Sequence, residues 1–242
     1  MTTATATESA TQTVVLSPET LEILKNFSEI QSNIIVTTGS ELHTMSESKS
    51  IVAKAKIAEK FKVPFGIFDL GEFLALVSTF DTPEFTFTEN QVTVREAGGK
   101  ASDRLIYLYS PVNLLTEPKS VGDFESAINF KVRSAVMNNL FKRAAIGRFG
   151  DLAIESNGDE IIMRVCNYNK DNPDSITNSA SVVVGQNDSG ATFRFLFKIE
   201  TIKMIPGTYD VFIAPEMISH WVNTKTDLQY WIAHEKESTY SE

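Results

Sequence analysis

The chain has 242 residues, 42 % of them hydrophobic and 22 % charged, a composition typical of a globular protein that buries real cores. Its formal net charge of -9 argues against a protein that wraps nucleic acid tightly, because phosphate neutralisation supplies most of such affinity. No apolar run approaches the length of a membrane span, and the N-terminus does not resemble a signal peptide. The single cysteine, Cys166, excludes a disulfide framework, so we expect a reducing, cytoplasmic environment.

Composition along the chain indicates two domains. Residues 1–13 are rich in Thr and Ala and offer nothing to bury, which predicts a disordered tail. Residues 111–124 contain two prolines and a glycine and lack periodicity. We therefore expect an N-terminal domain at 14–110, a connector at 111–124 and a C-terminal domain at 125–242.

Four amphipathic segments predict helices. The first begins with Ser17 as the N-cap and Pro18 at the first helical position. The second begins at Asp69, with Glu72 three residues later as in a capping box. The predicted helices cover residues 17–31, 69–80, 134–147 and 200–205, the last ending at a Pro-Gly pair.

Strand-like alternation fills the segments between these helices. Asn157-Gly158 predicts a hairpin between two such segments in the second half. Each half has the same order of parts: a helix, a hairpin and a further strand, a second helix, and more strands. The pattern therefore indicates an internal repeat of an α+β domain.

One segment departs from the acidic character of the chain. It contains five basic residues and no Asp or Glu: Lys131, Arg133, Lys142, Arg143 and Arg148. On a helix, Lys142 and Arg143 flank an apolar stripe that includes Met137 and Leu140, so one face is buried and another offers positive charge. Two interpretations stay open here, a surface for DNA and a simply solvated helix face.

Signatures of catalysis are missing from the sequence. The three histidines have no metal-ligand spacing, and Gly98-Gly99-Lys100 lacks the remaining glycine and the helix of a phosphate loop. Cys166 has no histidine nearby and is more simply a small core residue. We predict a protein without catalytic residues, cofactor or metal.

Several segments resemble one family. LKNF at 24–27, FDL at 68–70, IKMIPGTY at 202–209 and AHEKEST at 233–239 are similar to segments of the sliding clamps of T-even-type bacteriophages. The resemblance runs in order from about Val14 to the C-terminus. The chain departs from it in the Thr/Ala tail, in the connector and at residues 41–60.

This resemblance implies an α+β DNA-clamp fold with two similar domains, each with two helices packed on antiparallel sheet. Three chains would close a pseudo-sixfold ring around double-stranded DNA, with helices lining the hole. The implied function is to tether the replicative DNA polymerase and confer processivity in the cytoplasm of an infected bacterial host. The implied partners are DNA, held topologically and without reading its sequence, the polymerase, a clamp loader and late-transcription factors.

Three sets of residues follow as predictions. The expected DNA-facing set is Lys25, Arg133, Lys142, Arg143, Arg148, Lys198 and Lys203. Subunits are expected to meet where strand 104–109 of one chain pairs with 179–185 of its neighbour, since open edges invite aggregation. The expected interface residues are Leu105, Tyr107, Tyr109, Val182 and Val184. A partner peptide is expected near the connector, at Leu114, Leu115 and Phe124, although these side chains could simply tuck the connector onto the sheet.

Two other classes of protein remain as alternatives. One is a viral structural or assembly protein built from two β-rich domains. The other is a single-strand DNA-binding accessory protein, which would need exposed aromatic side chains among basic ones. Phe193, Phe195 and Phe197 alternate around Arg194 and Lys198, but we read this run as facing the core.

Overall fold

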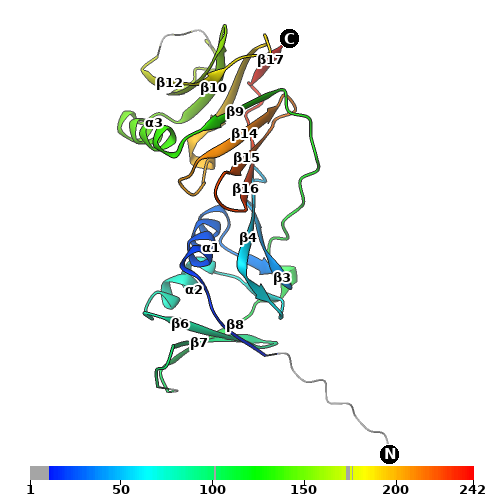
Figure 1. The fold of residues 1–242 in the computed structure, drawn as a ribbon, viewed down its shortest axis with the longest axis vertical. Helices are drawn as coiled ribbons and strands as arrows, with labels where there is room; N and C mark the ends of the chain where they lie inside the picture. Colours follow the sequence, from blue (N-terminus) through cyan, green and yellow to red (C-terminus); the bar gives the residue numbers. More distant parts are fainter. Residues whose placement is uncertain (1–10, 101, 173–174, 176) are drawn as a thin grey trace, which may run out of the picture. The chain divides into compact units, whose positions relative to one another are not determined.

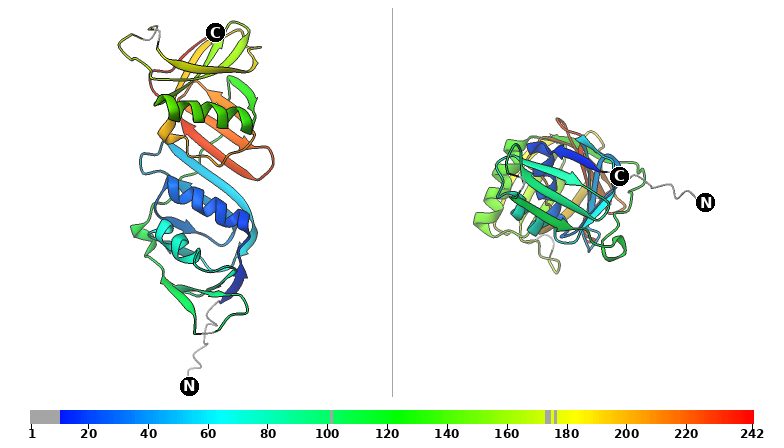
Figure 2. Two further views of the ribbon diagram at one scale, coloured as in Figure 1. Left: turned by 90° about the vertical axis from the view of Figure 1, so that its left-hand side faces the viewer. Right: turned by 90° about the horizontal axis from the view of Figure 1, so that it is seen from below.

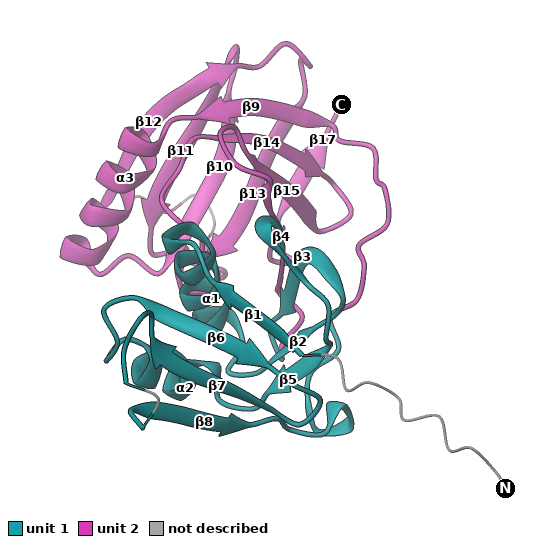
Figure 3. Ribbon diagram, turned by 60° about the horizontal axis from the view of Figure 1, so that its bottom comes forward, with its two compact units in different colours: residues 1–47, 54–118 teal, residues 48–53, 119–242 magenta. Residues whose placement is uncertain are grey.

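The computed structural model describes residues 11–100, 102–172, 175 and 177–242 (Figure 1). The chain divides into two compact units, coloured separately in Figure 3. Unit 1 comprises residues 1–47 and 54–118, and unit 2 comprises residues 48–53 and 119–242. Most of the predicted tail lies outside the described residues, but Gln12 and Thr13 belong to a strand. No helix in the described part of the chain is both long and apolar enough to span a membrane.

Unit 1 contains two helices, which lie side by side (Figure 2). In the first, Ser17 Oγ accepts a hydrogen bond from Thr20 N–H, and Pro18 occupies the first helical position, as predicted. In the second, Asp69 Oδ1 accepts from Glu72 N–H at 2.8 Å. The elements of unit 1 are β1 (Gln12–Val15), α1 (Pro18–Ile30), β2 (Ile34–Val36), β3 (Gly39–Met45), β4 (Ile51–Phe61, whose first three residues belong to unit 2), β5 (Phe65–Ile67), α2 (Leu70–Val77), β6 (Pro83–Phe87), β7 (Gln91–Glu96), β8 (Arg104–Leu108) and the 3-10 turn η1 (Val112–Leu114).

A four-stranded antiparallel sheet of unit 1 has the order β1-β6-β7-β8, with β8 at one edge. The buried side of α1 carries Ile23, Leu24, Phe27 and Ile30, spaced as an amphipathic helix requires. Stacked and edge-on phenylalanines from three strands fill the core beside it: Phe61, Phe65, Phe85 and Phe87.

Unit 2 is built from one long helix and two antiparallel sheet segments. The elements are β9 (Ile128–Val132), α3 (Ser134–Gly147), β10 (Asp151–Asn157), β11 (Glu160–Cys166), β12 (Ser179–Gln186), β13 (Thr192–Lys198), the 3-10 turn η2 (Ile199–Thr201), β14 (Tyr209–Ala214), β15 (Ile218–Asn223), β16 (Leu228–Ala233) and β17 (Thr239–Ser241). The hairpin predicted at Asn157-Gly158 joins β10 to β11, and Gly158 has the positive φ of 61° that such a turn requires.

The strands of unit 2 bury its core between them. One sheet has the order β12-β11-β10-β13-β17, so β12 lies at an edge. A second series pairs β9, β14, β15 and β16 in the order β9-β14-β15-β16. Phe193, Phe195 and Phe197 are all buried, which confirms that this aromatic run faces the core and leaves no exposed stacking platform for single-stranded DNA on β13.

The helix predicted at residues 200–205 does not form. Only the turn η2 is present, so the described residues of unit 2 contain one α-helix instead of two. A six-residue segment gains few helical hydrogen bonds against the cost of nucleation, and Pro206 disfavours helical geometry at the residue before it. The backbone bonds to side chains instead: Ile205 N–H donates to Tyr230 Oη at 3.1 Å, and Ile205 O accepts from Tyr209 Oη.

Candidate nucleic-acid interface and sheet edges

Helix α3 presents a basic surface. Its apolar side is buried through Met137, Leu140 and Ala144, and the helix packs against β11 and β12. Four basic residues on the helix and its two caps are exposed, and none forms an ion pair with a described residue: Arg133, Lys142, Arg143 and Arg148. Because the helix has no acidic residue, this surface carries concentrated positive charge.

Arg148 caps the C-terminal end of α3 in an unusual backbone conformation. Its φ and ψ are 55° and 41°, the left-handed region that glycine normally occupies at this position. Its N–H donates to the carbonyl oxygens of Ala144 and Ala145. A side chain other than glycine costs roughly 1–2 kcal/mol there. Arg148 therefore lowers the stability of the helix end relative to glycine at this position.

The remaining basic residues are placed differently. Lys131 lies on β9 and pairs with Asp210 at 3.2 Å, so it does not belong to the surface of α3. Lys25 is exposed on α1, in the same stripe as Glu22 and Glu29. Lys203 is exposed in the segment that follows η2.

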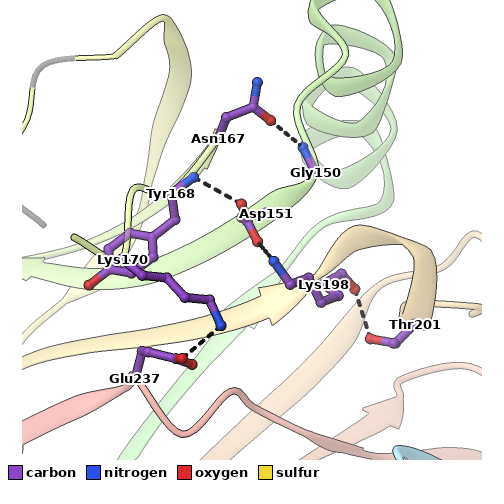
Figure 4. A network of polar contacts seen from close by, with 8 residues as sticks. All are labelled: Gly150, Asp151, Asn167, Tyr168, Lys170, Lys198, Thr201 and Glu237. Carbon is purple, nitrogen blue, oxygen red and sulfur yellow. Dashed lines mark hydrogen bonds and ion pairs between the residues drawn. The ribbon is translucent and has the colours of Figure 1, made fainter. Parts of the chain in front are cut away.

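Lys198 belongs to a polar network at the start of β10, drawn in Figure 4. Its Nζ lies 2.5 Å from Asp151 Oδ1, and Asp151 Oδ2 accepts a hydrogen bond from Tyr168 N–H at 2.9 Å. Asp151 is 6 % exposed, so this carboxylate depends on its partners. Beside it, Lys170 pairs with Glu237 at 2.7 Å. The charge of Lys198 is thus already engaged, and we leave it out of the DNA-facing set that is proposed below.

Both strands that were predicted to join subunits lie at sheet edges. β8 ends the four-stranded sheet of unit 1, and β12 ends the five-stranded sheet of unit 2. The alternative, that both strands are internal to their own sheets, is therefore wrong. Each strand presents backbone groups without a neighbouring strand in its own sheet.

The predicted side chains of these strands point inward. Leu105, Tyr107 and Tyr109 form the half-buried face of the segment 104–109: the Tyr107 ring packs on Phe73, and Tyr109 stacks on Phe65. Burial raises the pKa of both tyrosines above the ordinary value. On β12, Val182 and Val184 are half-buried in the same way. The exposed apolar residues are their neighbours, Ile106 at 45 %, Leu108 at 68 % and Val183 at 48 %.

Sequence reasoning missed these three exposed residues. Alternation predicted that one face of each strand is exposed, but both faces of 104–109 are apolar, so the pattern did not identify which.

The three predicted pocket residues belong to different units: Leu114 and Leu115 to unit 1, and Phe124 to unit 2. Leu115 packs on Gly66 in unit 1, where a Cβ on that glycine would lie only 2.3 Å from Leu115 Cδ1, and Leu114 is exposed. The expectation that the connector is tucked onto a sheet therefore holds for Leu115. Phe124, in contrast, lines a groove of about 450 Å³ in unit 2.

The groove at Phe124 is aromatic. His220 stacks on Trp231 with ring centroids 4.5 Å apart, and Phe124 meets the edge of His220. His220 Nε2 lies 3.0 Å from Gln229 Oε1, and burial lowers the pKa of the imidazole. At neutral pH the imidazole is therefore uncharged, and the aromatic rings give the groove an apolar surface with polar groups and the carboxylate of Asp123 at its lining, which suits an apolar side chain of a partner.

The described residues contain no group of three or more His, Cys, Asp or Glu that could hold a metal ion. Cys166 is buried, and burial raises the pKa of its thiol, so it remains a neutral core residue.

The architecture resembles that of solved PCNA structures. A. fulgidus PCNA, in a structure with the C-terminal region of FEN-1 bound, aligns with a TM-score of 0.65 and 11 % identity, covering 94 % of this chain and 99 % of its own. The PCNA2-PCNA3 complex from Sulfolobus tokodaii aligns with a TM-score of 0.63 and 10 % identity, covering 93 % of this chain and 99 % of its own. These similarities define the fold.

Sequence comparison finds similar proteins among bacteriophages. Residues 123–236 match the family described as gp45 sliding clamp, C terminal. The sliding clamp of Vibrio phage KVP40 is 28 % identical over 224 residues, 91 % of this chain and 98 % of that protein. The sliding clamp of Enterobacteria phage T4 is 25 % identical over 207 residues, 82 % of this chain and 86 % of that protein. The chain is similar to the sliding clamps of T4-type bacteriophages over most of its length.

Proposed function

We propose that three copies of this chain form a closed ring around duplex DNA and tether the replicative DNA polymerase to it. The observation that carries the proposal is the basic surface of α3, with Arg133, Lys142, Arg143 and Arg148 exposed and unpaired among the described residues of a chain of net charge -9. A surface of this kind suits the phosphate backbone and does not require side chains that read bases.

The modest number of basic residues fits a sliding protein. A closed ring stays on DNA because the two are linked, so high affinity is unnecessary. Each phosphate contact adds a counterion-release contribution to binding, and strong contacts would hinder movement along the duplex. The excess of acidic residues elsewhere on the chain would also discourage non-specific binding of DNA outside the ring.

The proposed subunit contact pairs β8 of one chain with β12 of the next. Both are edge strands, and both expose apolar residues, namely Ile106, Leu108 and Val183. Pairing would satisfy the open backbone groups and cover these side chains in one step. The sheets would then continue from one chain into the next around the ring.

The proposed docking site for the polymerase is the aromatic groove of unit 2. A terminal peptide of the polymerase with an apolar anchor residue would pack against Phe124 and the His220–Trp231 stack. The clamp loader would use the same groove, so the two partners would compete. By resemblance alone, we add late-transcription factors as further partners and the cytoplasm of the infected host as the location.

Retention on DNA of different topology tests the function. We expect the loaded protein to remain on nicked circular DNA during gel filtration and to be lost once the circle is cut, because a linear duplex lets a ring slide off. Sedimentation should give a trimer. A stable monomer at micromolar concentration, or equal retention on circular and linear DNA, would refute the ring.

A further inference from the structure

The exposed helical surfaces of the two units carry opposite charge. On α1 the exposed charged residues are Glu19, Glu22, Lys25 and Glu29, three acidic and one basic. The exposed residues of α2 include Glu72 and no basic residue. The surface of α3 has four basic residues and no acidic one.

The charged residues of α1 form one stripe. They are spaced by three, three and four positions, so they lie above one another on a single side of the helix. The other side is committed to the core through Ile23, Leu24 and Phe27. The acidic stripe is therefore the surface that α1 presents to its surroundings. Lys25 lies between Glu22 and Glu29 within it, and two carboxylates offset its single positive charge.

We infer that duplex DNA is held by α3 alone, and that the acidic stripe of α1 repels the phosphate backbone. This inference rests on the proposed ring, in which helices of both units line the hole. Three attractive surfaces would then alternate with three repulsive ones around the duplex. Lys25 consequently leaves the DNA-facing set, and unit 1 contributes closure of the ring without affinity for DNA.

Alternation of this kind has a physical purpose in a sliding protein. Attraction from every side would multiply phosphate contacts, and each contact must break as the ring moves. Repulsion from the α1 surfaces keeps the duplex off half of the lining, so the number of simultaneous contacts stays small. The charges act across water, so the effect of each carboxylate is modest and depends on ionic strength.

The test neutralises the stripe without touching α3. The variant Glu22→Gln/Glu29→Gln removes two negative charges, and Glu47→Gln/Asp227→Asn removes two from exposed sites off the helices. The trimer is titrated with a short, labelled, open-ended duplex at low and at physiological salt, and anisotropy reports binding. A duplex blocked at both ends by bound protein distinguishes threading from surface binding. Thermal unfolding of each variant confirms that it is folded.

We expect the α1 variant to bind the open duplex roughly two- to fourfold more tightly at low salt, with a smaller gain at physiological salt. The matched control should bind like the unmodified chain. Unchanged binding by a folded α1 variant, or an equal gain in the control, would overturn the inference. If the unmodified trimer does not prefer the open duplex over the blocked one, the ring itself fails, which is a separate result.

Discussion

Lys198 and Asp151 hold each other across neighbouring strands: the Lys198 ammonium lies 2.5 Å from a carboxylate that is almost fully buried at the start of β10. The same carboxylate accepts the N–H of Tyr168, so it also fixes the chain where β11 gives way to the following loop. In the sequence, Lys198 is indistinguishable from a lysine that is available to DNA. In the fold its ammonium stabilises unit 2 by pairing with the buried Asp151 carboxylate.

Replacing Lys198 by Met should therefore destabilise the protein and leave its DNA binding unchanged. Loss of the ammonium leaves Asp151 with one partner in a poorly hydrated site, which should cost about 2 kcal/mol of unfolding free energy, less than for a fully buried pair because Lys198 is partly exposed. Lys225→Met, at an exposed site, is the control and should be neutral. Chemical denaturation and duplex titration check the two expectations. A stable variant with weakened DNA binding would return Lys198 to the DNA-facing set.

Removing the positive charge of α3 should weaken DNA binding and leave the stability of the protein unchanged. Ala at Lys142, Arg143 and Arg148 removes three basic side chains from each of the three chains and should leave the trimer intact. It should reduce the slope of log K against log salt by about one for each phosphate contact that is lost. Lys56, Lys62 and Lys225 replaced together by Ala serve as the control. If polymerase processivity on primed DNA and the salt slope are both unaffected, the basic surface is merely solvated.

Arg148 offers a sharper test, because its backbone and its side chain are expected to have opposing effects. Arg148→Gly should raise the unfolding free energy by about 0.5–1 kcal/mol, since relief of the left-handed backbone exceeds the lost attraction between the cation and the end of α3. It should also weaken retention on DNA. Lys49→Gly and Met217→Gly relieve positive φ angles of 58° and 64° elsewhere and should stabilise without affecting DNA. If the Arg148→Gly variant is retained on DNA as well as the unmodified protein, the Arg148 side chain does not contribute to DNA binding.

Local signals in the sequence predicted the parts of the fold that are determined locally. Ser17, Pro18 and Asp69 begin their helices as expected, because a cap acts within one turn. The prediction of a helix at 200–205 was wrong. The backbone of Ile205 bonds to the hydroxyl groups of Tyr209 and Tyr230, and these side chains come close to it only when the sheet has formed.

The candidate site divides in the same way. The basic residues of the α3 surface lie close together in the sequence, from Arg133 to Arg148, whereas the pairing of Lys198 with Asp151 joins positions 47 residues apart. Alternation could not identify the outer face of β8, since Ile106 and Leu108 are as apolar as the half-buried Leu105. Helical spacing alone places Glu22 and Glu29 on the same side of α1 as Lys25, where their negative charges counter its positive charge. That this side is exposed follows only from the structure, in which the opposite side of α1 is buried.

Stability should fall as the medium becomes mildly acidic. Burial lowers the pKa of His234, whose Nε2 lies 3.0 Å from Ala214 O between the rings of Phe195 and Phe197. The unfolded chain takes up the proton first, near an ordinary pKa of about 6.5, so this contribution is complete above that pH and is lost as pH falls toward the folded value.

His234→Phe should reduce the decline of unfolding free energy between pH 7.5 and 5.5, by at most about 1.4 kcal/mol per pH unit. His43 and His220, whose pKa values are also lowered by burial, should account for the pH dependence of the unfolding free energy that remains in this variant. Only the slope is compared, because loss of the hydrogen bond to Ala214 lowers stability at every pH. An unaltered slope would show that His234 does not contribute.

The subunit contact is tested by charging the exposed face of β8. Ile106→Asp/Leu108→Asp places two carboxylates where the neighbouring β12 is proposed to pair, so we expect sedimentation to change from trimer to monomer. Val183→Asp should act in the same way from the opposite side. Ile146→Asp is the control, because Ile146 is 76 % exposed and belongs to α3 and not to either edge strand, and its variant should remain trimeric. Both units should still unfold cooperatively in the monomer, since Ile106 and Leu108 do not belong to the core. A charged β8 variant that stays trimeric would place the subunit contact on another strand.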